Sequence, residues 1–178
     1  MPAPHQPTRS TAAARRILGV DPGLRTTGWG LLAMTEGRAA LTYGVIQPDP
    51  AADRPVRLRT ILEGLLAAID AHQPDAVALE TPFVGANARS ALALGQAQAA
   101  AMLAASQRDL PVFEYAPREV KQAVSGDGNA EKSAVAEALR LQLGLEEAPR
   151  PLDASDALAV AYCHYLLGQH NVSEVSTP

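Results

Sequence analysis

The pattern of hydrophobic and polar positions predicts strands and helices that alternate along one folded domain. Short apolar runs bounded by turn residues are typical of strands, and apolar residues spaced three and four apart are typical of helices. The run from Arg16 to Asp21 predicts a buried strand, because the turn signal Asp21-Pro22-Gly23 ends it. The clearest helix spans Val56 to His72. Its apolar stripe consists of Leu58, Ile61, Leu62, Leu65, Leu66 and Ile69.

The other elements follow from the same two patterns. We predict further strands at 27–34, 40–46, 75–80 and 111–115, and helices at 87–107, 118–124 and 153–168. Another helix is predicted to begin at a cap formed by Asn129 and to run to about Leu143. Three antiparallel strands followed by strands alternating with helices predict an α/β fold, with a mixed five-stranded sheet flanked by helices. We expect this domain to span residues 15–168, between disordered tails at 1–14 and 169–178.

Composition fits a folded domain with an aliphatic core. The chain has 178 residues, enough for one sizeable core, and only 4% of them are aromatic. No apolar run is long and unbroken enough to span a membrane, and the first 14 residues lack a signal-peptide core, so we expect a cytoplasmic protein. The single Cys163 lies in an apolar run, which predicts a buried structural thiol rather than a nucleophile.

Four carboxylates lie at the ends of predicted elements, where a side chain is held firmly and still reaches solvent. Asp21 and Glu80 each end a strand, and Asp153 and Asp156 share one face at the start of a helix. Taken singly, each has a simpler interpretation as a turn residue, a solvated strand end or a helix-terminal charge. Together they have the composition of a site for Mg²⁺ or Mn²⁺. A pair of such ions about 3.5–4 Å apart can cleave a phosphodiester, so the pattern predicts a metal-dependent nuclease.

The formal net charge of −4 does not exclude a nucleic-acid partner. Proteins that bind phosphates usually carry a basic surplus. Two divalent ions on the four carboxylates would offset the negative charge, however, and the placement of charge matters more than its sum.

Six short motifs occur in order between about Arg16 and Leu167. They are Gly19-Val20-Asp21-Pro22-Gly23, Leu79-Glu80 with Phe83 and Asn87, Pro111-Val112-Phe113-Glu114-Tyr115, Val120-Lys121-Gln122, Ala130-Glu131-Lys132-Ser133, and Asp153-Ala154-Ser155-Asp156-Ala157-Leu158-Ala159. In this combination the chain resembles the RuvC family of Holliday-junction resolvases, within the RNase H-like nuclease superfamily. The resemblance implies two-metal-ion catalysis with Mg²⁺ (Mn²⁺ substituting) on Asp21, Glu80, Asp153 and Asp156. It also implies a homodimer that nicks four-way junction DNA symmetrically in recombination and repair, working with the RuvA–RuvB branch-migration complex.

Three residues have DNA-contacting roles implied by the resemblance. Phe83 matches the aromatic that stacks on an unpaired base at the junction centre, although without the family packing in the core would be the favoured interpretation. Lys121 and Lys132 are the only lysines of the chain and match two DNA-contacting lysines. Ordinarily two such lysines would be solvated surface residues, but Lys132 lies in the first turn of a predicted helix, where phosphate is favoured.

One departure from the family pattern concerns the segment after Phe83. Many relatives carry a lysine where this chain has Ala86, which removes one expected phosphate contact. Arg89 could take over that contact, and Arg118 is a further candidate for the same phosphate track.

Alternatives of other classes account for less of the pattern. The alanine-rich helix at 87–107 could form a dimer contact or simply be buried, and the sequence does not separate the two. An actin-like ATPase would also place Asp and Gly after a first strand, but it needs a second glycine-rich loop and gives Asp153 and Asp156 no role. A junction-binding protein without catalysis would have no need of four intact acids.

Overall fold

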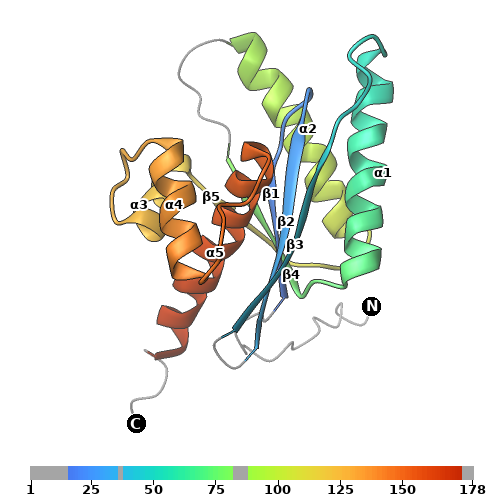
Figure 1. Cartoon of the computed structure of the whole chain (residues 1–178). Coiled ribbons are helices and arrows are strands. Elements are labelled where there is room, and N and C mark those ends of the chain that lie inside the picture. The colour runs from blue at the N-terminus through green and yellow to red at the C-terminus, as the bar shows by residue number, and fades with distance from the viewer. Residues whose placement is uncertain (1–15, 36–37, 82–87, 174–178) are drawn as a thin grey trace, which may run out of the picture.

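A single mixed sheet with helices on both faces makes up the fold of the computed structural model, which describes residues 16–35, 38–81 and 88–173 (Figure 1). The strands are β1 (Arg16–Asp21), β2 (Thr27–Thr35), β3 (Arg38–Ile46), β4 (Ala76–Glu80) and β5 (Val112–Tyr115). The helices are α1 (Arg54–His72), α2 (Ala88–Ser106), α3 (Pro117–Ser125), α4 (Lys132–Gln142) and α5 (Leu152–Ser173). None of the helices in these ranges is long and apolar enough to cross a membrane.

The strand order β3-β2-β1-β4-β5 confirms the predicted mixed sheet. β1 pairs antiparallel with β2, and β2 pairs antiparallel with β3, whereas β4 lies parallel to both β1 and β5. β1 is therefore the central strand, and Asp21 is its last residue. Val20 has paired strands on both sides, and Asp21 itself pairs with Gly28 of β2, so the backbone at this point is held firmly.

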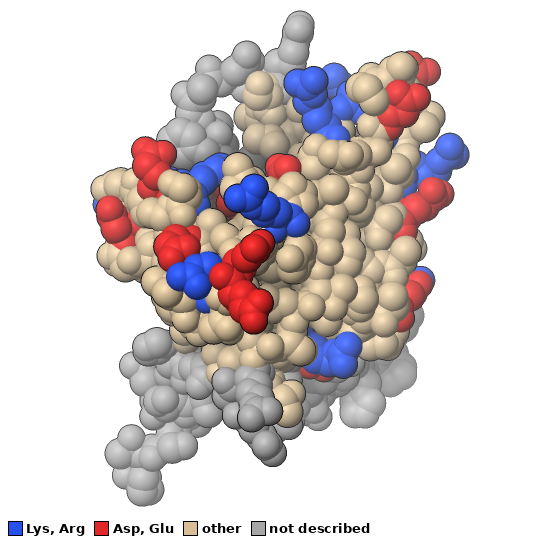
Figure 2. All heavy atoms as spheres, viewed as in Figure 1, with Lys and Arg blue, Asp and Glu red and all other residues tan. Residues whose placement is uncertain are grey.

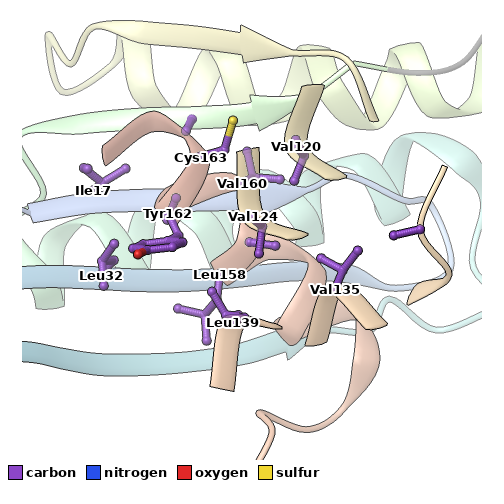
Figure 3. Close-up of a cluster of buried hydrophobic side chains, with 14 residues drawn as sticks. Ile17, Leu32, Val120, Val124, Val135, Leu139, Leu158, Val160, Tyr162 and Cys163 are labelled. Atoms are coloured by element: carbon purple, nitrogen blue, oxygen red, sulfur yellow. The ribbon is translucent and has the colours of Figure 1, made fainter. Parts of the chain in front are cut away.

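Alternating side chains of the central strands build two cores, one on each face of the sheet. Leu18 and Leu31 point to the face covered by α1 and α2, and Ile17 and Leu32 point to the face covered by α3, α4 and α5. Figure 3 shows the second cluster, where Cys163 is fully buried as predicted. The predicted apolar stripe of α1 is also confirmed, since its members pack in the first cluster.

The predicted cap of α4 is wrong. The helix begins at Lys132 and its N-cap residue is Glu131, two positions after Asn129. Asn129 instead belongs to a turn, in which its backbone N–H donates to Asp127 Oδ1 at 2.9 Å and the N–H of Ala130 donates to Asp127 O at 3.1 Å. The Asp127 side chain thus closes an Asx-type turn, which competes with helix initiation at this point.

α5 is also longer than the pattern predicts. Its end was expected near Gly168, but the helix continues to Ser173. Glycine inside a helix costs only about 1 kcal/mol relative to alanine. Packing of the preceding turns against the sheet stabilises α5, so Gly168 does not end it.

Candidate functional site

Asp21 and Glu80 lie side by side because their strands are parallel neighbours. Val20 pairs with Leu79 in the register of β1 and β4, and the two acids are the next residue in each strand. Both side chains are partly buried. The parallel arrangement therefore brings the two strand-end carboxylates to one edge of the sheet, as the sequence predicts.

Glycines on β1 and β2 allow α5 to bring its acids to the same edge. Gly28 is the β2 residue that pairs with Asp21, and a Cβ added to it would lie 2.0 Å from the carbonyl oxygen of Asp153. A Cβ added to Gly19 would lie 1.9 Å from the carbonyl oxygen of Ala157. Real side chains do not approach so closely, so α5 can lie on these strands only because both residues are glycine. The backbone of α5 therefore fills the space beside Gly28.

Asp21 and Glu80 are influenced by burial and by the negative charge of neighbouring acids. Burial raises the pKa of Asp21 to about 6, and the negative charges of Asp156 and Asp153 add to this, while Lys132 opposes them. Burial likewise raises the pKa of Glu80 to about 7, with further contributions from Asp21 and Asp156 that Lys132 and Lys121 oppose. Like charges that disfavour ionisation in this way must lie near one another in a poorly solvated environment. The structure therefore brings the predicted acids together as one negatively charged group.

Lys132 is the basic residue in direct contact with this group. Its Nζ donates to Asp156 Oδ2 at 2.5 Å, which joins the start of α4 to the start of α5. Burial lowers the pKa of Lys132, but the hydrogen bond and the charges of Asp156, Asp21 and Glu80 outweigh this and raise it overall. The ammonium thus lies where three of the four carboxylates act on it.

The acids are neighbours without forming a finished coordination shell. Within residues 16–35, 38–81 and 88–173, no three Asp, Glu, His or Cys side chains converge closely enough to hold a metal ion as they stand. The donor set still fits a hard divalent cation, because carboxylate oxygens are the ligands that Mg²⁺ prefers. Burial, with a smaller contribution from neighbouring acids, raises the pKa of Asp21 and Glu80, and a bound cation would favour their ionised form. Asp21, Glu80, Asp153 and Asp156 are the residues that could supply oxygen ligands to such an ion.

Two residues that position the loop after Asp21 were not predicted from the sequence. Thr27 is fully buried, and its Oγ1 donates to Gly23 O at 2.8 Å and accepts from the Gly23 N–H at 3.3 Å. Arg57 of α1 donates from Nη2 to Leu24 O at 2.7 Å. Both residues fix the loop that follows Asp21. The threonine four residues after Gly23 was a readable signal for a side-chain-closed turn, whereas the α1 contact depends on tertiary packing.

The candidate DNA-contacting residues lie on several elements around the acids. Lys121 lies on α3, near enough to Glu80 for its positive charge to oppose the rise in the pKa of that carboxyl. Arg118 is exposed on the same helix, and its side chain crosses the backbone of Gly128, where a Cβ would lie 2.8 Å from Arg118 Cγ. The Gln122 side chain holds the loop between α3 and α4, since Nε2 donates to Gly126 O at 2.8 Å and Oε1 accepts from the Gly128 N–H at 3.2 Å.

The remaining candidates for the DNA surface belong to the segment from Phe83 to Arg89. Phe83 and Ala86 lie outside the described residues, and Arg89 lies in the first turn of α2, where only the backbone is described. Figure 2 shows basic and acidic side chains interspersed on the visible face, with Lys and Arg near the end of the sheet where β1 joins β2. This face of the molecule therefore carries charges of both signs, although the net charge is −4.

Comparison with known proteins gives a consistent answer. The family model described as crossover junction endodeoxyribonuclease RuvC matches residues 17–164. The RuvC protein of Dehalococcoides mccartyi is 47% identical over 151 residues, which cover 84% of this chain and 90% of that protein. RuvC of Chlorobaculum parvum is 51% identical over 148 residues, covering 83% of this chain and 79% of that protein.

Solved structures agree with the sequence comparisons. T. thermophilus RuvC, determined in complex with a Holliday junction substrate, superposes with a TM-score of 0.82 at 34% identity. The match covers 88% of this chain and 96% of that one, so the five-stranded sheet and its helices have the RNase H-like arrangement of that protein. From the family match, the identities and the shared fold together, this chain belongs to the RuvC family of crossover junction endodeoxyribonucleases.

Proposed function

We propose that this protein is a Mg²⁺-dependent endonuclease that resolves four-way DNA junctions by paired symmetric nicks, in homologous recombination and DNA repair. The observation that carries the proposal is the group of four carboxylates at one edge of the sheet, in a chain of this family. Relatives at 47% and 51% identity bear the name of crossover junction endodeoxyribonuclease, and the T. thermophilus protein was determined with a Holliday junction substrate.

The four acids would hold the metal ions from three elements. Asp21 is the most rigid of them because β1 is the central strand, and Glu80 lies beside it on β4. Asp153 and Asp156 come from the first turns of α5. When bound, two Mg²⁺ ions would supply Lewis-acid chemistry that activates a water and offsets charge on the leaving 3′ oxygen. Mn²⁺ has similar ligand preferences and would substitute.

The protein's own contribution is to orient the acids and the DNA backbone. Thr27 and Arg57 fix the loop after Asp21, and the close packing on Gly28 fixes the start of α5. Lys121, Lys132 and Arg118 lie on α3 and α4, on the side of the site where phosphates would run. Such contacts position the duplex without reading its sequence. Arg89 would extend this track, and Phe83 would stack on an unpaired base at the junction centre.

A four-way junction has two equivalent strands to cut, so we extend the proposal to a homodimer. The outer side of α2 supports this, because Leu92 and Leu103 lie 11 residues apart on one helix face with 59% and 55% of their areas exposed. Large exposed leucines on one face favour a helix contact with a second copy. The proposal also includes cooperation with the RuvA–RuvB complex and a cytoplasmic location. The nuclease domain would begin near residue 15 and, instead of ending at 168, include all of α5 to Ser173.

The decisive test replaces Asp21 by asparagine. We expect Asp21→Asn to bind a labelled mobile four-way junction like the wild type and to lose nicking by a factor of at least about 10³ with Mg²⁺ or Mn²⁺, because one ligand of the proposed metal site is removed. Parallel reactions with a linear duplex, and without metal, report on structure specificity and metal dependence.

Asp109→Asn is the matched control for this test. Asp109 is exposed at the other end of the sheet and has a positive φ of 52°, which asparagine tolerates. The junction-nicking activity of Asp109→Asn should equal that of the wild type. Normal junction nicking by Asp21→Asn would contradict the proposed site, and equal cutting of the linear duplex would contradict junction specificity.

A further inference from the structure

The contact between Lys132 and Asp156 places a positive charge on a proposed metal ligand. Lys132 Nζ and Asp156 Oδ2 are 2.5 Å apart, a short distance even for a charge-assisted hydrogen bond. The two residues come from different helices and are 24 positions apart, so the pair does not follow from local helix geometry. The carboxylate side is 16% exposed and the lysine side chain is 64% exposed. Asp156 is therefore the more buried partner, and the exposed side chain of Lys132 is the one that has room to move.

The surroundings of this pair distinguish it from an ordinary surface ion pair, which contributes little to stability. Asp21 and Glu80 both act on the ammonium, and Lys132 in turn opposes the rise in their pKa that burial and, to a smaller extent, neighbouring acids cause. One ammonium thus offsets part of the repulsion among several carboxylates. A divalent cation bound by the same oxygens would offset this repulsion more completely.

The ammonium and a metal ion would compete for the same oxygen. Asp156 Oδ2 accepts a hydrogen bond from Nζ at 2.5 Å, and an inner-sphere Mg²⁺ needs a carboxylate oxygen at about 2.0–2.1 Å. Two positive charges on one carboxylate oxygen repel each other strongly in a poorly solvated site. The flexible, exposed lysine arm is the group that would move.

We propose that Lys132 is a displaceable internal counterion, which holds Asp156 until a divalent ion binds the carboxylates and then releases it. The inference rests on the proposed function in one respect, namely that the four acids bind metal. Release turns the ammonium toward solvent at the first turn of α4, where a phosphate would be favoured. Metal binding and the availability of Lys132 for the DNA backbone are thereby linked.

The first experiment measures Mn²⁺ binding to the DNA-free protein by isothermal titration calorimetry. We expect Lys132→Met to bind Mn²⁺ about tenfold more tightly than the wild type, because the metal no longer has to break a charge-assisted hydrogen bond. Lys121→Met is the matched control, since it removes the other lysine, which acts on Glu80 but has no ion pair among those found in the described residues. Its affinity should change by less than about threefold.

The second experiment follows the lysine itself in the wild-type protein. Because the chain has two lysines, a sample labelled with ¹³C,¹⁵N-lysine gives two sets of side-chain signals, which a Lys121→Arg variant assigns. Diamagnetic Mg²⁺ should move the Lys132 Cε and Nζ signals toward the values of a free lysine and leave those of Lys121 in place. This measurement needs no change at Lys132 and does not depend on activity.

The outcomes separate the inference from the proposed function. If Mn²⁺ binds the wild type, and Asp156→Asn weakens binding while Lys132→Met binds no more tightly than Lys121→Met, the counterion role is wrong and the metal site stands. Unchanged Lys132 signals at saturating Mg²⁺ would likewise overturn the counterion role alone. If neither ion binds the wild type or the lysine variants, the metal dependence itself is wrong.

Discussion

At the scale of single residues, the chemistry of this protein depends on carboxylates that the fold forces together. Asp21 and Glu80 have pKa values of about 6 and about 7, well above those of free side chains. A raised pKa means that the folded state binds a proton more tightly than the unfolded chain does. These two groups therefore favour folding at low pH and oppose it increasingly as the pH rises past their unfolded and then their folded pKa values.

Asp21→Asn should for this reason stabilise the protein when a chelator is present. Near pH 4 the carboxyl is largely protonated in the folded state, so the variant and the wild type should differ little. From pH 4 to above pH 6 the advantage of the variant should grow to on the order of 1–2 kcal/mol in the free energy of unfolding, allowing for partial solvent exposure of the side chain. Urea unfolding at a series of pH values with EDTA measures this. An advantage that does not vary with pH would show that charge repulsion is not its cause.

Gly28 offers a second test, because its missing side chain sets the position of α5. A methyl group there would lie 2.0 Å from the carbonyl oxygen of Asp153, so Gly28→Ala must push the strand and the helix apart. We expect a loss of roughly 3 kcal/mol in the free energy of unfolding, at the upper end of the cost of overpacking. Metal affinity should fall with it, since Asp153 moves away from Asp21. Thermal unfolding and Mn²⁺ titration measure the two effects.

Gly95→Ala is the control for that substitution. Gly95 lies inside α2, and no described atom lies within 4 Å of the position where its Cβ would be. Alanine should therefore stabilise the helix by about 0.5–1 kcal/mol. If both alanine variants are equally stable, the close approach of α5 to β2 is not as tight as the structure indicates.

At the scale of elements, the sequence predicted those segments whose pattern is local. The central strands, α1 with its apolar stripe, and the strand-end positions of Asp21 and Glu80 are all as predicted, because periodicity and the turn signals at Pro22 and Pro82 are local properties. The cap at Asn129 and the end of α5 at Gly168 were wrong, because competing hydrogen bonds and tertiary packing decide them. The Lys132–Asp156 contact could not be predicted, since it depends on how α4 and α5 pack.

That packing is itself open to test on α4. Leu139 is fully buried in the cluster with α5, whereas Leu141, two residues later, is 63% exposed. Leu139→Ala should lower the free energy of unfolding by about 2–5 kcal/mol through lost apolar contact and the remaining cavity. Leu141→Ala should change it by less than about 0.5 kcal/mol. Equal effects in chemical denaturation would mean that α4 does not pack on α5 as described.

At the scale of the whole molecule, a junction-resolving enzyme needs two active sites. We expect the wild type to be a dimer at micromolar concentration, and Leu103→Glu to shift it toward monomer by burying a charge in the proposed α2 contact. Leu141→Glu places the same charge on an exposed leucine of α4 and should remain dimeric. Size-exclusion chromatography with light scattering gives the masses. A monomeric wild type that also fails to pair on junction DNA would contradict the dimer.

α5 contributes both to the core and to the site. Its buried residues pack in the cluster that it shares with α3 and α4, and it supplies two of the four acids. A truncated product that stops before Leu152 therefore lacks two of the four acids. It also exposes the apolar face of the sheet that α5 covers. Such a fragment could not persist as a folded subunit that occupies junctions without cutting them, because its exposed apolar surface would direct it to proteases or aggregates. Nonsense mutations upstream of this helix should consequently remove the protein altogether, whereas a folded but inactive protein should require missense changes that leave α5 in place.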